Sequence, residues 1–316
     1  MDCQVNLHDA LRCFCFAILL LVIPWSASGT ESNFTLEVGG GHIDAVVSGG
    51  GLQPSQADIT RWVQNAAESV TAYYGHFPVP HLTLHIKIFD GTGVHGGRTY
   101  GERGGFITIG LGSKTTAQQL ASDWMMTHEM VHLTFPSVPD RNHWIEEGIA
   151  TYVEPIARIQ AGHLDVTTMW AEVVRDMPNG LPAAGDRGLD NTHTWGRTYW
   201  GGAMFCLLAD VQIRRETKNQ KGLQDALRGI LNGGGDIRYD WELEDALQLG
   251  DRSTGTHVLM NLYKKMGSSP TGADLDALWR GLGISAAGGA IQFNDEAEIA
   301  QIRRAITASA PASKLR

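Results

Sequence analysis

The sequence predicts an α+β protein in which a sheet-containing lobe precedes a helical lobe. Two observations predict this class. In the first half of the chain, strand-like and helix-like spacings of apolar residues follow one another, whereas the second half shows only helix-like spacing. We place a mixed or antiparallel sheet with helices in residues 29–160 and an all-helical lobe in residues 161–316. We expect no independent folding boundary between them, because both should contribute to one cleft.

The strands of the first lobe are predicted from period-2 alternation. Residues 34–38 and 43–47 alternate around a run of three glycines, which predicts a pair of strands. Residues 81–89 alternate most regularly. A glycine-rich loop is expected over 91–105, followed by a strand over 105–109. That strand is either an interior strand or a sheet edge that pairs with an extended peptide.

Helices are predicted from apolar side chains three and four residues apart. Ser55 and Asp58 have the spacing of a capping box, and a stripe of apolar residues follows them. In the second lobe, helices are expected over 165–177, 199–214, 222–231, 254–265 and 273–282. Cys206 lies in one of these apolar stretches and is expected to be a core residue.

The most informative motif is His128-Glu129-Met130-Val131-His132. Histidines at i and i+4 of a helix face the same way, so both rings can reach one metal ion. Zinc binds such nitrogens and requires a third protein ligand, which leaves one position for water. Glu129 lies between the histidines, where it can take a proton from that water.

The third ligand is expected on a second helix. Residues 119–127 contain no glycine or proline, so one helix can run through the histidines, and two prolines after the motif end it. A returning helix can begin near Asn142 and stop at Pro155. It carries Glu146 and Glu147, either of which can turn back to the metal. Asp123 and Glu154 are candidate hydrogen-bond partners of the histidines, alongside the neutral Thr151.

These motifs resemble the gluzincin zinc metallopeptidases of the peptidase MA-like group. The match consists of the His128–His132 motif followed by Trp144-Ile145-Glu146-Glu147-Gly148-Ile149-Ala150-Thr151-Tyr152. In that clan the Glu before the Gly is the third zinc ligand, so the resemblance implies Glu147. It also implies a thermolysin-like pair of zinc-binding helices and one Zn²⁺ per chain.

Residues 105–307 as a whole are most similar to the glycyl-aminopeptidase-like family. Thr198-Tyr199-Trp200-Gly201-Gly202-Ala203 resembles the helix that follows the active site in that family, where a tyrosine stabilises the transition state. The resemblance therefore implies a catalytic role for Tyr199, for which the alternative is a core aromatic. His193 is a competing oxyanion donor, and His143 is expected to be a capping or surface residue.

The chain departs from the zinc aminopeptidases in one motif. It lacks Gly-x-Met-Glu-Asn, whose Glu binds the substrate amine. Glu102 is the only acidic candidate for that task shortly before the metal helix. Aminopeptidase and endopeptidase activity therefore both remain open.

The N-terminus predicts export. Residues 14–25 are apolar but too few to span a bilayer, and small residues follow them, which is typical of a secretory signal peptide over 1–28. A retained membrane anchor is the alternative. The leader carries two Asp and one Arg, so its removal would change the net charge from −9 to −8. An acidic chain argues against nucleic-acid partners.

The predicted function is therefore that of an exported zinc-dependent metallopeptidase. It would be secreted or periplasmic, would act on a peptide or protein substrate, and would have no membrane span once the leader is cleaved. Glu129 is its expected general base. The alternative is a non-catalytic, zinc-bound scaffold that binds peptides or a protein partner.

Overall fold

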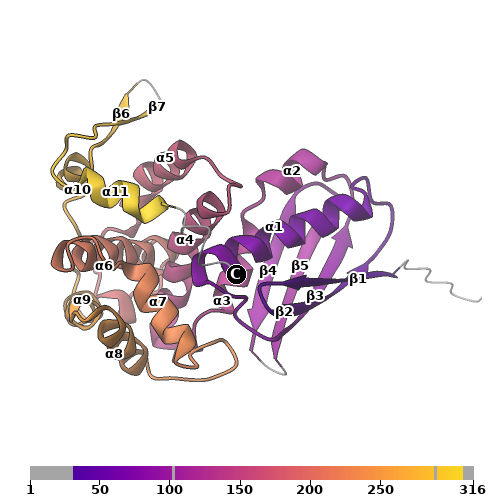
Figure 1. Ribbon diagram of the computed structural model, residues 1–316, viewed down its shortest axis with the longest axis horizontal. Coiled ribbons are helices and arrows are strands. Elements are labelled where there is room, and N and C mark those ends of the chain that lie inside the picture. Colours follow the sequence, from indigo (N-terminus) through magenta and orange to yellow (C-terminus); the bar gives the residue numbers. More distant parts are fainter. Residues whose placement is uncertain (1–30, 102–103, 288–289, 309–316) are drawn as a thin grey trace, which may run out of the picture.

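The computed structural model describes residues 31–101, 104–287 and 290–308, which form a sheet lobe and a helical lobe (Figure 1). The predicted leader 1–28 and Glu102 lie outside these residues. The α+β class is confirmed. No helix in the described ranges is long and apolar enough to cross a membrane.

The first lobe is built on a five-stranded mixed sheet. Its strands are β1 (Glu31–Val38), β2 (Gly41–Ser48), β3 (His81–Phe89), β4 (Val94–Tyr100) and β5 (Gly105–Gly112), in the order β1-β2-β3-β5-β4. The three central strands are parallel, and both edge strands are antiparallel to their neighbours. Alternate residues of β2, β3 and β5 are buried on one face, where they join the hydrophobic core with α1 (Gln56–Tyr74). Ser55 and Asp58 form the predicted capping box of α1.

The expected loop over 91–105 is wrong in part, because it contains the edge strand β4. β4 pairs with β5, from Val94 opposite Leu111 to Tyr100 opposite Phe106, with a register shift in between. β5 is therefore interior, and the sheet edge lies one strand further along. Glycine-rich β4 has no apolar alternation, so pairing with β5 rather than its own pattern makes it a strand.

The expected single helix through the histidines is also wrong, because it is two helices. α2 (Ala117–Ser122) ends at Asp123, whose backbone is extended at φ −63° and ψ 136°. The Asp123 carboxylate accepts hydrogen bonds from the backbone amides of Met125 and Met126, at 3.2 and 3.1 Å. It thereby caps the N-terminus of α3 (Met125–His132). Because this side chain binds backbone amides that a continuous helix would use, α2 does not continue into α3.

The returning helix is α4 (His143–Gln160), which follows the 3₁₀ turn η1 (Asp140–Asn142). It does not stop at Pro155, because Ile156 and Ala157 are buried in the core and hold the last turn in place. Asn142 makes no side-chain cap; its amide donates to Asp190 Oδ1 at 2.9 Å. α4 ends at Gln160, where we placed the lobe boundary, and that boundary stays a prediction.

The second lobe is helical apart from one hairpin. Its elements are α5 (Val166–Asp176), η2 (Met177–Gly180), η3 (Leu189–Asn191), η4 (Gly196–Gly201), α6 (Gly202–Glu216), α7 (Leu223–Asn232), α8 (Leu243–Thr254), α9 (Val258–Met266), α10 (Leu275–Leu282), β6 (Ile284–Ala287), β7 (Ala290–Phe293) and α11 (Ala300–Thr307). The expectation of an all-helical lobe therefore needs correction for β6 and β7, and neither α8 nor α11 is among the expected helices. α6 packs against α4, and Cys206 on α6 is buried as a free thiol.

Candidate active site

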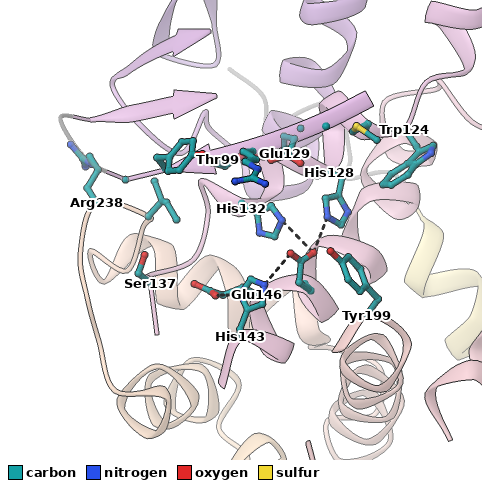
Figure 2. Close-up of a pocket in the computed structure, with 18 of the residues that line it drawn as sticks. Thr99, Trp124, His128, Glu129, His132, Ser137, His143, Glu146, Tyr199 and Arg238 are labelled. Atoms are coloured by element: carbon teal, nitrogen blue, oxygen red, sulfur yellow. Dashed lines mark hydrogen bonds and ion pairs between the residues drawn. The ribbon is translucent and has the colours of Figure 1, made fainter. Parts of the chain in front are cut away.

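Three side chains from two packed helices converge at the boundary between the lobes (Figure 2). His128 and His132 lie one turn apart on α3, and Glu147 lies in the second turn of α4. His128 Nε2 is 3.2 Å and His132 Nε2 is 3.6 Å from Glu147 Oε2. One ligand atom from each residue lies within 4.8 Å of the other two. The structure therefore brings together the set expected from the motif and the resemblance.

The chemistry of this set fits a divalent metal ion. Two imidazoles and one carboxylate are the ligands of one common type of catalytic zinc site. Burial lowers the pKa of His128, which favours the neutral ring that a metal requires. Burial acts the same way on His132, but Glu147 outweighs it and raises the pKa of that ring. Burial would raise the pKa of the Glu147 carboxyl, but hydrogen bonds with His128, His132 and His143 outweigh it and lower that pKa. His128, His132 and Glu147 are thus the residues that could hold zinc.

Glu129 is buried beside these ligands and is held by the edge strand. Thr99 Oγ1 on β4 donates to Glu129 Oε2 at 2.6 Å and lies 2.9 Å from the Glu129 backbone oxygen. A Cβ added at Gly97 would lie 2.4 Å from Glu129 Oε1, so only glycine admits the carboxylate this close to the strand. β4 therefore fixes the position of the expected general base.

His143 contacts the oxygen of Glu147 that the two α3 histidines do not contact. Its Nε2 is 3.3 Å from Glu147 Oε1, and its Nδ1 is 2.8 Å from Glu146 Oε2. Hydrogen bonds with Glu146 and Glu147 raise the pKa of His143 to about 10. The other oxygen of Glu146 accepts from the Val138 amide at 3.4 Å, and Glu146 is not part of the three-residue cluster.

Tyr199 reaches the cluster from the second lobe. It lies in η4, a π-helical turn that leads into α6, and such turns are frequent at functional sites. Its ring stacks on His128 at 6.4 Å between centroids (Figure 2), and its hydroxyl is close enough to Glu147 to interact with that carboxylate. Burial, with a smaller contribution from the negative charge of Glu147, raises the pKa of Tyr199 to about 12.

Two glycines let α6 approach α4 closely, and η4 leads directly into α6. A Cβ on Gly148 would lie 2.3 Å from the carbonyl carbon of Gly202, and one on Gly202 would lie 2.2 Å from the Trp144 oxygen. Arg197, a residue of η4, anchors this turn. Its guanidinium pairs with Asp186 at 2.7 Å, and both side chains are almost fully buried.

Two cavities of about 830 Å³ each adjoin the cluster. The first is lined by β4 and by Ile237, Arg238 and Asp240 from the loop before α8. The second is lined by α5 and three tryptophans, Trp124, Trp195 and Trp200. Both cavities include Trp124, His128 and Tyr199 in their walls. The two recesses thus adjoin at His128 and Tyr199, and the first also includes His132 and Glu147.

Several candidates have other partners. His193 is exposed and lines neither cavity. Asp123 caps α3, and Glu154 pairs with Arg158 at 2.8 Å. Sequence reasoning did not assign Thr99 to the site. It expected His143 to be a capping or surface residue; His143 is indeed exposed, but it also contacts Glu147. The signal for His143 was its position four residues before Glu147, whereas no sequence signal places Thr99 against Glu129.

The fold and the cluster together can be compared with those of known proteins. The chain has a mixed sheet whose edge strand lies beside two helices, and these helices carry His-Glu-x-x-His and a third acidic side chain. Solved structures with a similar fold include zinc metallopeptidases. An aminopeptidase N family protein from Idiomarina loihiensis matches 81% of this chain with a TM-score of 0.62 at 13% identity.

That match shows the fold. An M1 zinc metallopeptidase from Deinococcus radiodurans is also similar, with 15% identity over 78% of this chain and a TM-score of 0.49. The chain spans about half the length of these proteins, 50% of the first and 53% of the second. No protein-family model matches the sequence, and neither does any curated protein.

Proposed function

We propose that this protein is an exported zinc-dependent metallopeptidase that hydrolyses peptide bonds, with Glu129 as general base. One observation carries the proposal: His128, His132 and Glu147 converge beside Glu129 in the wall of an open cavity. Metal-assisted hydrolysis needs a metal site and a general base that face the same cavity, and this arrangement supplies both.

The residues divide the chemistry between them. Zinc held by His128, His132 and Glu147 would polarise the scissile carbonyl and make a water molecule more acidic. Glu129 would take a proton from that water and later deliver it to the leaving nitrogen. Thr99 holds the carboxylate in position during both transfers. Tyr199, a protonated phenol at neutral pH, would donate a hydrogen bond to the developing oxyanion.

The surroundings of the cluster support an extended peptide as substrate. β4 is the edge strand, and residues 96–101 line the first cavity. A peptide can add to such an edge through main-chain hydrogen bonds, which requires no particular sequence. The tryptophans of the second cavity favour a large apolar side chain on the other side of the scissile bond.

The same surroundings favour cleavage inside a chain over removal of one terminal residue. The recesses lie on both sides of His128 and Tyr199, so the substrate has room in both directions. β4 has no acidic residue to bind a free amine, and Arg98 lies there instead. Of the two further acids that line the first cavity, Glu146 contacts His143, and Asp240 lies on the loop before α8. We therefore infer an endopeptidase within the gluzincin class.

Digestion of a mixed peptide library, with and without chelator, tests the activity and the type of cleavage together. We expect chelator-sensitive cleavage at internal bonds, with a large apolar residue on one side. Products that lack only their N-terminal residue would show an aminopeptidase instead. Expression of the full chain, with residues 1–28 included, tests export. We expect the secreted protein to have an N-terminus near residue 29 when it is sequenced.

The alternative is a zinc-bound scaffold without activity, and Glu129→Gln separates the two. The peptidase proposal predicts that this variant keeps one zinc at the cluster and loses hydrolysis. Glu68→Gln is the matched control, because Glu68 lies on α1 outside both cavities. A wild-type protein that binds zinc and peptides but cleaves nothing in the library would favour the scaffold.

A further inference from the structure

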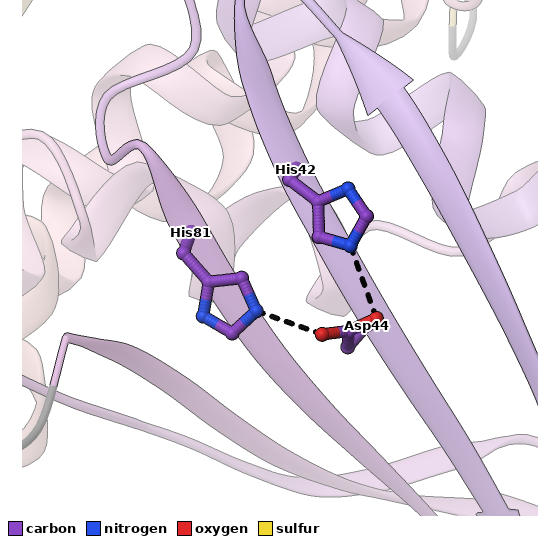
Figure 3. A group of neighbouring side chains, drawn as sticks. All are labelled: His42, Asp44 and His81. Atoms are coloured by element: carbon purple, nitrogen blue, oxygen red, sulfur yellow. Dashed lines mark hydrogen bonds and ion pairs between the residues drawn. The ribbon is translucent and has the colours of Figure 1, made fainter.

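A second cluster of metal-binding side chains lies on the outer face of the sheet (Figure 3). It consists of His42 and Asp44 on β2 and His81 on β3. Their neighbours Ile43 and Leu82 point to the opposite face, into the core with α1 and α3. The cluster is therefore separated from the candidate active site by the sheet itself.

The strand register creates this cluster. His42 and His81 are direct partners in the parallel pair of β2 and β3, and Asp44 is two residues further along β2 on the same face. The two imidazoles stack, with centroids 5.6 Å apart and planes within 10°. Ligands on paired strands are held more rigidly than ligands on a loop.

The distances suit one divalent ion. Asp44 lies between the rings, with Oδ1 3.1 Å from His42 Nε2 and Oδ2 2.8 Å from His81 Nε2. One atom from each residue lies within 4.8 Å of the other two. Ligands about 2.1 Å from a tetrahedral zinc lie about 3.4 Å from one another, so small side-chain rotations are enough to bind it.

A fourth residue supports His42 as a ligand. Glu37 on β1 is the register partner of His42, and its Oε1 is 2.5 Å from His42 Nδ1. A carboxylate on the far nitrogen of a histidine is the usual means of directing the other nitrogen to a metal. Glu37 and Asp44 together carry two negative charges, which match a divalent cation. Among the described residues, neither carboxylate pairs with lysine or arginine.

We propose that His42, Asp44 and His81 form a second metal site, which binds Zn²⁺ or a similar divalent ion on the outer face of the sheet. All three side chains are partly exposed, at 37%, 47% and 48%, so the ion would keep a position open to solvent. The ion would link β2 to β3 next to the β1–β2 turn. It takes no part in hydrolysis, and the site does not depend on the proposed peptidase activity.

Zinc stoichiometry of the full chain tests the site directly. The protein is stripped with chelator, equilibrated with Zn²⁺, desalted and analysed by inductively coupled plasma mass spectrometry. We expect two zinc ions per chain in the wild type and one in His81→Ala. Asp44→Asn, which keeps the size of the side chain, should also bind one. Glu37→Gln should weaken binding at this site about 10- to 100-fold.

His85→Ala is the matched control, because His85 is on the same face of β3 but contacts Phe106 instead of the cluster. It should keep two zinc ions. Anomalous scattering at the zinc edge should place the second ion between His42 and His81. One zinc per chain in both the wild type and His81→Ala, or no anomalous peak at this cluster, would overturn the proposal. Two zinc ions in a chain that hydrolyses nothing would still support it.

Discussion

The hydroxyl of Thr99 donates a 2.6 Å hydrogen bond to the carboxylate of Glu129. It joins the edge strand of the sheet to the residue expected to move the proton. The side chain that positions the base thus comes from the strand on which we expect the substrate to bind. Substrate position and base position are therefore coupled through one strand.

Thr99→Val tests this coupling. Valine has the same shape but no hydroxyl, so Glu129 loses a hydrogen bond to a charged group, which is typically worth about 1.5–3 kcal/mol. We expect kcat to fall about tenfold or more, with little change in KM and unchanged zinc content. Thr99→Ser, which restores the hydroxyl, should recover most of the activity. An unchanged kcat in Thr99→Val would show that the contact does not position the base.

Tyr199→Phe tests the oxyanion donor. Loss of one such donor typically lowers kcat about 10²- to 10³-fold, and the ring contact with His128 should survive. Steady-state kinetics and zinc analysis on the same sample separate this effect from metal loss. Tyr239→Phe, at an exposed tyrosine beside the cavity, is the control and should retain full activity. A Tyr199→Phe variant as active as that control would assign the ring to packing alone.

Gly148→Ala tests the close approach of α4 and α6. Alanine normally stabilises a helix relative to glycine, but here its Cβ would lie 2.3 Å from the Gly202 backbone. We expect a loss of about 1–3 kcal/mol in the free energy of unfolding, together with reduced activity, because Glu147 is the adjacent residue.

Gly281→Ala on α10 provides the comparison for that variant. The nearest atoms to its Cβ are at an ordinary 3.4 Å, so alanine should raise the free energy of unfolding by about 0.5–1 kcal/mol. Urea denaturation measures both variants. Equal effects of the two substitutions would contradict a special role for the Gly148 contact.

Glu154 should make stability depend on pH. Burial outweighs the ion pair with Arg158 and raises the pKa of Glu154 to about 7. The folded state therefore prefers the protonated acid. This contribution to stability is fully present below the ordinary glutamate pKa and is lost as pH rises through about 7.

Glu154→Gln should remove that dependence. We compare the free energy of unfolding of Glu154→Gln with that of the wild type at each pH. The difference, variant minus wild type, should increase by about 3 kcal/mol between about pH 4.5 and pH 8, because the wild type loses its contribution from protonated Glu154. Urea denaturation at several pH values measures the difference. Glu216→Gln, at an exposed acid on α6 that does not act on Glu154, should show no such trend. A constant difference between wild type and Glu154→Gln would mean that Glu154 stays ionised throughout.

Local patterns predicted much of the site and its supports. The i, i+4 spacing of His128 and His132 and the apolar alternation of β3 are properties of short segments, so they can be recognised without knowing the fold. The capping box of α1 is of the same kind. Identifying Glu147 required the resemblance, since Glu146 is equally close in the sequence.

What the sequence by itself determined is therefore the α+β class and the metal-binding motif, because period and spacing along one element decide which side chains share a face. Tertiary structure alone decided that β4 is the edge strand, that Thr99 holds Glu129 and that His143 contacts Glu147. It also brought His42 and His81 together across two strands. These contacts join residues on different elements, and only the register of the sheet and the packing of the helices determine which of them meet.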